Sequence, residues 1–572
     1  MLIGIDIGGT FTDAVLIQDG CIIASCKRRT TKQNLMVGLL EALDGVLTKV
    51  NTPDIERVTL STTVITNTVV EGKEEPVDLF VITGPGMNVD HAFPVEPNYI
   101  SGYTDHRGIV VEEANFNEID KKMSQRTSLA AVSAKFSVRN PHEEERLSNY
   151  LRTNCNDTYT YVSTGSTLSG SLNFPRRTIS AYFNSAVSPA FARFKTAVED
   201  ALCARSIIAP LHILKADGGA LPMPIISERP VETVFTGPAA TVLGLYGLGA
   251  IGEEDTVALD IGGTTTDISL WRNGKPLLMK HGVTIRNFPS AVRAFAVQSI
   301  GIGGESIVTM KDGHIAVGPE RKGPSLALGG SHLTLGDALL ALGTTHYGDV
   351  ELAKQGILDF GKEYGLVDYE AKASIFSISR TIVATSIETI KTAIRATIDL
   401  ENKRPVYVVA DMVNPNEFTV EKLVVVGGTA AALGPLLAEK LTLPVDVPFG
   451  GAVANAIGAA VALPTIELTA HVDTKRRKLV VPELGIEQSS TLRTGDSVAK
   501  EALDLLATEA NRLGLYSTDK MEVLSIEDFP VVEGWHSVER LITVKVQLQA
   551  GVTTPIFETD SSVGEIGDNY DK

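Results

Sequence analysis

Cysteine is scarce in this chain of 572 residues. Its only thiols are Cys21, Cys26, Cys155 and Cys203, and no two of them form a Cys-x-x-Cys pair. A disulfide framework or a structural zinc site needs more thiols at closer spacing, so this composition excludes both. So few cysteines are typical of a protein from a reducing compartment, and we expect a cytoplasmic location.

Long apolar runs are also missing. The longest weakly polar stretch, residues 450–463, is too short and too rich in alanine and glycine to span a bilayer, so we expect no membrane segment. The first residues carry no basic cluster and meet an acidic side chain at Asp6. This start predicts a first strand and not a signal peptide.

Positive charge is in deficit, with 51 lysines and arginines against 69 acidic residues and a net charge of −18. A surface of this sign repels nucleic acid and anionic membranes, so we expect neither as a partner. The basic run at residues 475–478 precedes an expected strand and fits a solvated turn. Hydrophobic content of 44% and charged content of 21% are typical of a globular protein, and this length predicts two or three domains.

One seventeen-residue motif occurs twice, at residues 4–20 and 258–274, with nine identical positions. Each copy is an apolar run that ends in an aspartate, Asp6 or Asp260, followed by Gly-Gly-Thr and a second β-rich run. This pattern predicts a hairpin with a glycine tip. The matched tip residues are Gly8, Gly9, Thr10 and Thr12 in the first copy and Gly262, Gly263, Thr264 and Thr266 in the second.

Paired glycines let backbone N–H groups approach an anion closely, and threonine hydroxyls add donors. A single motif of this kind is often only a tight turn, but turn chemistry does not require matched carboxylates. Two copies therefore favour a nucleotide triphosphate held with Mg²⁺ between duplicated domains. We expect Asp6 and Asp260 to be the metal ligands. Asp6 or Asp13 acting as a base is the alternative, and the sequence leaves these catalytic roles open.

The repeat resembles the two phosphate loops of the sugar-kinase, chaperone and actin superfamily of ATPases. This resemblance implies an α/β fold with two ribonuclease-H-like domains, a deep cleft between them and bound ATP. Residues 423–434 resemble the adenosine motif of that superfamily, although an ordinary strand-glycine-helix corner is an alternative. Residues 299–307 resemble its nucleotide-closing loop, and residues 451–460 its small-residue crossing helix. The nucleotide contacts so implied are Gly303, Gly304, Glu305, Gly427, Gly428 and Thr429.

Four segments are similar to the hydantoinase A and oxoprolinase family within this superfamily. They are residues 3–15, 61–73, 231–240 and 258–270, and the resemblance covers most of residues 1–465. The stretch after residue 82 departs from the family pattern, so the ATP site is better supported than the substrate. The resemblance implies an ATP-dependent hydrolase that phosphorylates the carbonyl of a cyclic amide such as a hydantoin or lactam.

Other functions compatible with this resemblance are a small-molecule kinase and an ATPase switch that reactivates a partner enzyme. The family also implies a small-molecule substrate, a possible B-type partner subunit and a possible homo-oligomer. Two places are candidates for binding that substrate. Thr62, Thr63, Thr66 and Asn67 lie between a strand and a helix, where a plain helix cap is an equal alternative. Asp337 is the one charge on an apolar helix and is either a cap or a substrate ligand.

We expect three domains: residues 1–200, residues 201–465, and a small α/β appendage at residues 466–572 with an acidic, frayed tail. The expected early strands are residues 2–7, 13–18, 21–26, 58–61 and 77–82, with a helix at 35–50. Strands at 129–137 and 159–162 and a helix at 180–187 should complete the first domain. In the appendage we expect strands at 478–481, 522–526 and 542–549 and a helix at 497–513.

Overall fold

A computed structural model describes residues 1–31, 34–48, 54–87, 89–119, 121–123, 127–367, 371–403, 417–515, 520–533 and 536–557. Its first sheet has the strand order β12-β11-β4-β1-β2-β3. The strands are β1 (Leu2–Ile7), β2 (Phe11–Gln18), β3 (Cys21–Arg29), β4 (Arg57–Thr62), β11 (Leu211–Leu214) and β12 (Ala220–Pro222). A meander followed by parallel strands on the other side of β1 is the ribonuclease-H-like arrangement, so this part of the predicted fold is confirmed.

The second sheet repeats this plan with the order β15-β14-β13-β21-β22 and with β18 beside β14. Its strands are β13 (Thr256–Ile261), β14 (Thr266–Arg272), β15 (Lys275–Pro276), β18 (Val297–Ile300), β21 (Lys422–Val426) and β22 (Val445–Asp446). Short pairs β16 (Thr284–Ile285) with β17 (Phe288–Pro289), and β19 (Val308–Lys311) with β20 (His314–Val317), lie between them. The helices of this half are α8 (Leu335–Ala341), α9 (Val350–Glu363), α10 (Ala371–Asn402) and α12 (Ala430–Leu441).

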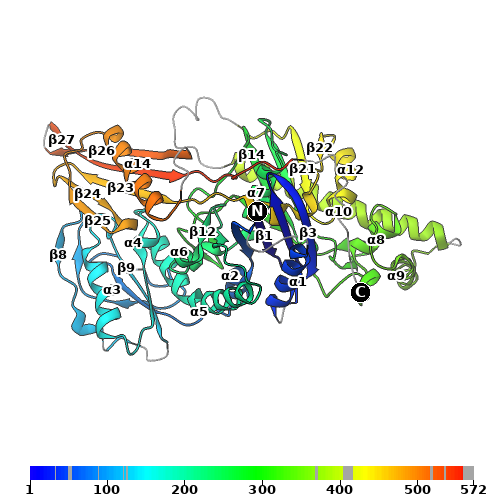
Figure 1. The fold of residues 1–572 in the computed structure, drawn as a ribbon, viewed down its shortest axis with the longest axis horizontal. Coiled ribbons are helices and arrows are strands. Elements are labelled where there is room, and N and C mark those ends of the chain that lie inside the picture. The colour runs from blue at the N-terminus through cyan, green and yellow to red at the C-terminus, as the bar shows by residue number, and fades with distance from the viewer. Residues whose placement is uncertain are drawn as a thin grey trace.

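Two helices made of small residues cross between the sheets, α7 (Thr236–Gly247) and α13 (Ala454–Val461). Their backbones touch: a Cβ at Gly458 would lie 2.0 Å from the Ala240 carbonyl oxygen, and one at Gly4 of β1 would lie 2.0 Å from the carbonyl oxygen of Ala456. Only glycine fits at these two positions. The predicted crossing helix after residue 451 is therefore confirmed, and it joins the two halves (Figure 1).

The later strands that we expected in the first domain form a sheet of their own. The order of this inserted sheet is β10-β9-β5-β6, from β5 (Asp78–Ile82), β6 (Asn98–Tyr99), β9 (Leu129–Ala134) and β10 (Tyr161–Thr164). The place beside β4 belongs instead to β11, which pairs with β4 in parallel. The first sheet therefore draws strands from both sides of residue 200, because β11 and β12 follow the 31-residue helix α5 (Phe174–Ala204).

The remaining helices of the first half are α1 (Leu35–Leu47), α2 (Val64–Val70), α3 (His142–Asn154), α4 (Gly165–Leu168) and α6 (Met223–Ile226). Strands β7 (Tyr103–Thr104) and β8 (Val110–Glu112) pair beside the inserted sheet. Helix α1 packs on β2 and β3, and α13 packs on β1. Both faces of the first sheet are thus covered, which explains the nearly complete burial of β1 and β4.

The appendage is an antiparallel sheet with one helix. Its strand order is β25-β24-β23-β27-β26, from β23 (Glu467–Asp473), β24 (Lys478–Val481), β25 (Ile486–Ser489), β26 (Met521–Glu533) and β27 (His536–Leu548), with α14 (Gly495–Arg512). The α/β composition agrees with the prediction, although the prediction omitted β23 and β25 and made β26 and β27 too short. Most of the predicted acidic tail lies outside the described residues.

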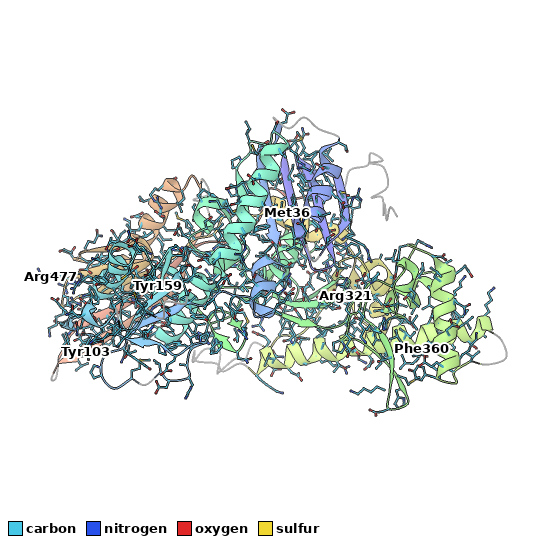
Figure 2. All side chains as sticks on the ribbon, turned by 90° about the horizontal axis from the view of Figure 1, so that it is seen from below. Met36, Tyr103, Tyr159, Arg321, Phe360 and Arg477 are labelled. Carbon is cyan, nitrogen blue, oxygen red and sulfur yellow. The ribbon has the colours of Figure 1, made fainter. Side chains whose placement is uncertain are left out.

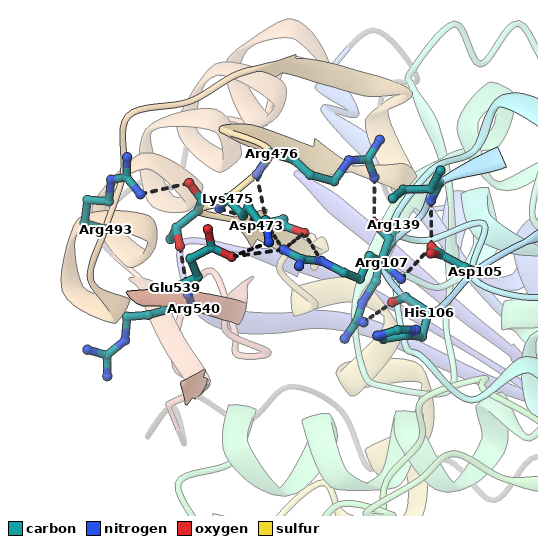
Figure 3. Close-up of polar contacts among 12 residues, drawn as sticks. Asp105, His106, Arg107, Arg139, Asp473, Lys475, Arg476, Arg493, Glu539 and Arg540 are labelled. Atoms are coloured by element: carbon teal, nitrogen blue, oxygen red, sulfur yellow. Dashed lines mark hydrogen bonds and ion pairs between the residues drawn. The ribbon is translucent and has the colours of Figure 1, made fainter. Parts of the chain in front are cut away.

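The appendage is attached to the inserted sheet by charged side chains. Arg107 donates to both carboxylate oxygens of Asp473, with N···O distances of 2.9–3.1 Å, and Arg476 donates to the Arg107 carbonyl oxygen at 2.6 Å (Figure 3). These two sheets form one end of the molecule, and α8, α9 and α10 form the other (Figure 1). The first and second sheets lie between them. No helix of the described chain is long and apolar enough to cross a membrane.

Candidate functional site

The two Gly-Gly-Thr tips face each other. The hydroxyls of Thr10 and Thr264 are 2.8 Å apart, and a Cβ at Gly263 would lie 3.0 Å from the Thr10 methyl carbon. Each tip closes with the same bond, from the Gly8 amide to the Phe11 carbonyl and from the Gly262 amide to the Thr265 carbonyl, both at 3.0 Å. The predicted pair of glycine-tipped hairpins is confirmed, and the duplication brings both copies to one place between the two halves of the molecule.

Four carboxyl groups lie behind these tips, because Asp6 pairs with Asp13 across β1 and β2 and Asp260 pairs with Asp267 across β13 and β14. Burial, together with the charges of Asp13 and Asp260, raises the pKa of Asp6 to about 7 against the hydrogen bonds from Ser61 and Asn455 that lower it. Burial and the charge of Asp260 raise the pKa of Asp267 to about 7. A cation bound beside these buried carboxyl groups would therefore stabilise their charged form.

Asp13 has a cation of its own. Lys27 of β3 lies 2.6 Å from its carboxylate, yet burial still raises the pKa of Asp13 above its ordinary value. Asp6 has no such ion pair among the described residues. Asp13 is thus ion-paired with Lys27, whereas Asp6 accepts from Asn455 of α13, and which of the two acts as a base stays a prediction.

Two helix residues link Asp6 to Asp260 across the cleft. Asn455 of α13 donates to Asp6 at 3.3 Å, and the Thr241 hydroxyl of α7 lies 2.8 Å from the Asn455 side-chain oxygen and 2.6 Å from Asp260. The single hydroxyl proton of Thr241 can serve only one of these two acceptors at a time. Helices α7 and α13 therefore hold the two aspartates in a fixed relation.

Sequence reasoning missed Thr241 and Asn455, although the sequence contains a sign of them. Residues 237–244 and 451–458 share the pattern Gly-x-x-Ala-polar-x-x-Gly, and the two polar positions are Thr241 and Asn455. Asp267 was also missed as a site residue, although it is the copy of Asp13 in the second repeat. Comparison of each repeated segment with its copy therefore marks Thr241, Asn455 and Asp267 as candidate site positions.

Two glycine loops of the second half, residues 303–305 and 427–428, lie beside the second tip. The amides of Gly304 and Glu305 donate to the carbonyls of Gly262 and Gly263 at 3.0 and 2.7 Å. Gly427 has a φ of +98°, and a Cβ there would lie 2.5 Å from Asp260, so only glycine fits this corner. A Cβ at its neighbour Gly428 would meet nothing within 4 Å, which leaves open space above this corner.

Thr429 and Glu305 hold these loops in place. The Thr429 hydroxyl donates to the Ile261 carbonyl at 2.9 Å. Glu305 is buried between Arg29 of the first half, at 3.0 Å, and Arg321 of the second half, at 2.5 Å. Figure 2 labels Arg321 between the first sheet and the helical end of the molecule. The Glu305 carboxylate thus joins the two halves, a role that the Gly-Gly-Glu pattern alone does not reveal.

Two predicted threonines use their hydroxyls inside their own half of the molecule. Thr12 bonds the Thr30 hydroxyl at 3.0 Å, and Thr266 donates to the Ile302 carbonyl at 2.6 Å; both side chains are fully buried. They lie on the strands and not at the tips, so their side chains enter the sheet packing. A contact of Thr12 or Thr266 with phosphate stays a prediction.

Asp337 is a capping residue. It forms a capping box with Thr334 at the start of α8, and its two oxygens also accept from the amides of Leu326 and Ala327 at 3.1 and 2.9 Å. The side chain is fully buried. The cap alternative is confirmed, and these bonds occupy the oxygens that a substrate would need.

The segment from Thr62 to Asn67 lies between the first tip and α7. The Thr63 hydroxyl donates to the Ile7 carbonyl at 3.1 Å and accepts from the Asn67 amide at 3.3 Å. Thr66 accepts from the Phe235 amide at 2.8 Å, where Phe235 has a φ of +56° just before α7. Thr62 accepts from the Val64 amide at 3.2 Å, while Thr63, the N-cap residue of α2, forms no side-chain capping bond. The segment fastens β1 to α7, and its substrate role stays a prediction.

The site fits a divalent cation that is bound together with phosphate. One oxygen of Asp6 is buried without a hydrogen-bond partner among the described residues. Within the same residues, no group of three or more His, Cys, Asp or Glu side chains could hold a metal ion by itself. Mg²⁺ commonly takes one or two carboxylates and completes its shell with phosphate oxygens and water, so this donor set suits it.

Two ribonuclease-H-like halves with facing phosphate-type tips define the fold of the sugar-kinase and actin class. The chain belongs to the hydantoinase/oxoprolinase family: the family model matches residues 177–468, and the model of the family's N-terminal region matches residues 2–155. The resemblance found in the sequence is thus confirmed.

The alpha subunit of caprolactamase from Pseudomonas jessenii is 25% identical over 401 residues, which cover 62% of this chain and 57% of that subunit. The gamma subunit of acetophenone carboxylase from Aromatoleum aromaticum is 26% identical over 400 residues, which cover 60% of this chain and 54% of that subunit. Acetone carboxylase in its nucleotide-free structure superposes with a TM-score of 0.69 at 16% identity, covering 97% of this chain and 88% of that one. The chain spans about half the length of the two curated relatives.

Proposed function

We propose that this chain binds ATP with Mg²⁺ between its two Gly-Gly-Thr tips and uses it to phosphorylate the carbonyl oxygen of a cyclic amide, such as a lactam or hydantoin. The observation that carries the proposal is the contact between Thr10 and Thr264 above the linked aspartates Asp6 and Asp260. Relatives named for ATP-dependent or lactam chemistry support the choice of reaction.

Each part of the site has a task in this reaction. The amides of the two tips and of the 303–305 loop would hold the phosphates, and the open corner at Gly427 and Gly428 would take the nucleoside. Asp6 and Asp260 would hold the cation, which supplies neutralisation of the charge that develops on the transferred phosphoryl group. The bonds from Asn455 and Thr241 fix both carboxylates before ATP arrives.

Phosphorylation addresses the difficulty of this chemistry, because an unstrained amide carbonyl is a poor electrophile. Phosphorylation of the oxygen makes the carbonyl carbon a good electrophile. In a second step water adds to that carbon, the ring C–N bond breaks as the nitrogen takes up a proton, and a further water releases inorganic phosphate from the resulting acyl phosphate. We propose that a B-type partner subunit supplies that second step, because two relatives are named as subunits of larger enzymes.

Calorimetry with ATP and Mg²⁺, followed by turnover assays, tests this function. We expect ATP binding to the isolated chain and phosphate release that rises when 2-pyrrolidinone, ε-caprolactam or hydantoin is added. A stable phosphorylated product in ³¹P NMR, without phosphate release, would instead establish a kinase. Absence of binding at millimolar ATP, in protein shown to be folded by circular dichroism, contradicts the proposal.

A further inference from the structure

A cavity of about 420 Å³ lies at the carboxyl edge of the first sheet, outside the nucleotide site. Its wall residue Lys215 directly follows β11, which is parallel to β4, and β4 is parallel to β1. Neighbouring strands are about 4.8 Å apart, so Lys215 and the first Gly-Gly-Thr tip share one sheet edge, about two strands apart. Open α/β sheets bind their ligands at this edge.

Four separate parts of the chain close the cavity. They are the start of α5 with the loop before it, the segment from β11 through α6, residues 291–293 of the second half, and the appendage. Much of the lining is hydrocarbon, including Leu221, Ile225, Val292, Leu468 and Leu484. A space of this volume with a largely apolar wall is of the size that small organic ligands occupy.

The cations of the lining already have carboxylate partners. Lys215 lies 3.1 Å from Asp217 and 3.4 Å from Glu232. Arg293 lies 2.7 Å from Glu467. The other two pairs are Arg229 with Glu232 at 3.4 Å and Arg512 with Glu509 at 2.7 Å. The lining holds six acidic and four basic residues, so a ligand with a carboxylate or a phosphate would have to compete with a protein carboxylate for each cation.

Glu483 brings a buried carboxyl group to the lining, close to the Thr469 hydroxyl, which lowers its pKa. One of its oxygens accepts from the Gly170 amide at 2.8 Å, and the other is buried with no hydrogen-bond partner among the described residues. Burial raises the pKa of the Glu483 carboxyl to about 7. A buried acceptor left unpaired is costly, and a ligand N–H beside it would remove that cost.

We infer that this cavity binds the organic substrate of the proposed reaction, and that this substrate is an uncharged cyclic amide whose N–H donates to Glu483 while its hydrocarbon ring packs on Ile225 and Leu484. The inference rests on the proposed function and narrows its substrate class to lactams without an acidic substituent. Arg293, which has N–H donors beyond the one that meets Glu467, is suited to the carbonyl end of such a ring.

A matched pair of probes tests the charge preference in the full-length chain. 2-Pyrrolidinone and 5-oxoproline share one five-membered lactam ring, and only the second carries a carboxylate. We expect ligand-observed NMR to detect 2-pyrrolidinone binding and to give at least about tenfold weaker binding for 5-oxoproline, because like charges meet in the cavity. Equal or tighter binding of 5-oxoproline, or no binding of 2-pyrrolidinone at 20 mM, overturns the inference.

Two variants test the location. Glu483→Met removes the acceptor, and Ile225→Trp fills the space from the opposite wall; each should weaken 2-pyrrolidinone binding by about tenfold or more. Glu487→Gln is the control, because Glu487 is exposed on β25 of the same appendage and pairs with Lys478 outside the cavity. Unchanged lactam binding in Ile225→Trp overturns the inference even if Glu483→Met fails to fold.

The two proposals fail separately. All three variants should bind ATP as the unmodified chain does, because none of the changed residues lies at the Gly-Gly-Thr tips. Lactam binding in the cavity without any stimulation of ATP turnover would support the cavity and contradict the proposed reaction. Lactam-stimulated turnover that persists in Ile225→Trp would support the reaction and overturn the cavity.

Discussion

Asp6 and Asp260 are equivalent residues in the duplicated motif, and each is held by a side chain from a crossing helix. We expect Asp6→Asn and Asp260→Asn each to lower ATP turnover by about 100-fold or more, because each removes a charge that the metal complex needs in the transition state. Neither change alters the apolar core, so the far-ultraviolet circular dichroism should be preserved. Turnover is measured by phosphate release with saturating ATP and Mg²⁺.

The control for this pair is Asp312→Asn, in the exposed turn between β19 and β20. It removes the same charge from the second half of the molecule and should leave turnover unchanged. Near-normal rates in both Asp6→Asn and Asp260→Asn would show that the tips are structural turns and that the cation lies elsewhere.

His471 makes the stability of the appendage sensitive to acid. Its Nε2 donates to the Gly170 carbonyl at 2.8 Å, so its Nδ1 accepts from the Thr543 hydroxyl at 3.1 Å. Burial lowers the pKa of His471 to about 3, with the charges of Arg139, Arg177 and Lys545 acting in the same direction. The folded histidine stays neutral where an unfolded one becomes charged.

This pKa shift fixes the sign of a pH effect. Above pH 6.5 both states are neutral, and between pH 6.5 and about 3 only the unfolded state takes up the proton, so stability falls as the pH falls. The loss is about 1.4 kcal/mol per pH unit, or about 2 kcal/mol at pH 5. Urea unfolding at pH 7 and pH 5 should show this loss in the unmodified chain and a smaller one in His471→Asn. Equal losses in both chains would contradict the argument.

At the scale of elements, the crossing of α7 and α13 depends on glycine. A Cβ at Gly458 would lie 2.0 Å from the Ala240 carbonyl and 2.5 Å from the Gly244 amide, both of them backbone atoms that cannot turn away. We expect Gly458→Val to reduce the free energy of unfolding by about 3 kcal/mol or more. Urea titration followed by circular dichroism measures it.

Gly237→Ala is the matched control on α7, because a Cβ there meets nothing within 4 Å. It should change the free energy of unfolding by less than about 1 kcal/mol, since alanine is also the better helix former. A Gly458→Val chain as stable as this control would mean that the two helices can move apart at no cost.

Local chemistry explains which elements the sequence predicts. The motif at residues 4–20 predicts β1, its tip and β2, because glycine geometry and strand alternation are both local. The placement of β11 beside β4 is not local, since it depends on which of several short apolar strands reaches that edge after α5. The sequence therefore predicts β5, β9 and β10 individually and does not predict that they form a separate sheet with β6.

The site shows the same limit. The sequence predicts both tips and both aspartates, because the duplication marks them. The bonds through Thr241 and Asn455 become visible only when α7 and α13 cross, and Asp337 has the same sequence appearance as a cap and as a ligand. The duplication in the sequence therefore marks the positions of these residues, and the bonds that each of them forms depend on how the helices pack.

At the scale of the whole molecule, the carboxyl groups behind the two tips repel one another when no cation is bound. The charges of Asp13 and Asp260 raise the pKa of Asp6, and the charge of Asp260 raises the pKa of Asp13 and of Asp267, so carboxyl groups from both halves oppose one another. Helices α7 and α13 and the ion pairs of Glu305 are among the contacts that join the halves across this repulsion. A bound cation with its phosphates would convert the repulsion into a bridge.

We therefore expect the two halves to close when nucleotide and Mg²⁺ are present together and not with either alone. Small-angle scattering should show a smaller radius of gyration with a non-hydrolysable ATP analogue and Mg²⁺ than with the analogue in EDTA. In Asp260→Asn, the radius of gyration should depend less on Mg²⁺, because this change removes the charge that acts on the other three carboxyl groups. Such closure would exclude water from a reactive phosphorylated substrate. A radius of gyration that is the same in every condition would mean that the tips keep their contact throughout the cycle and that ATP enters without domain motion.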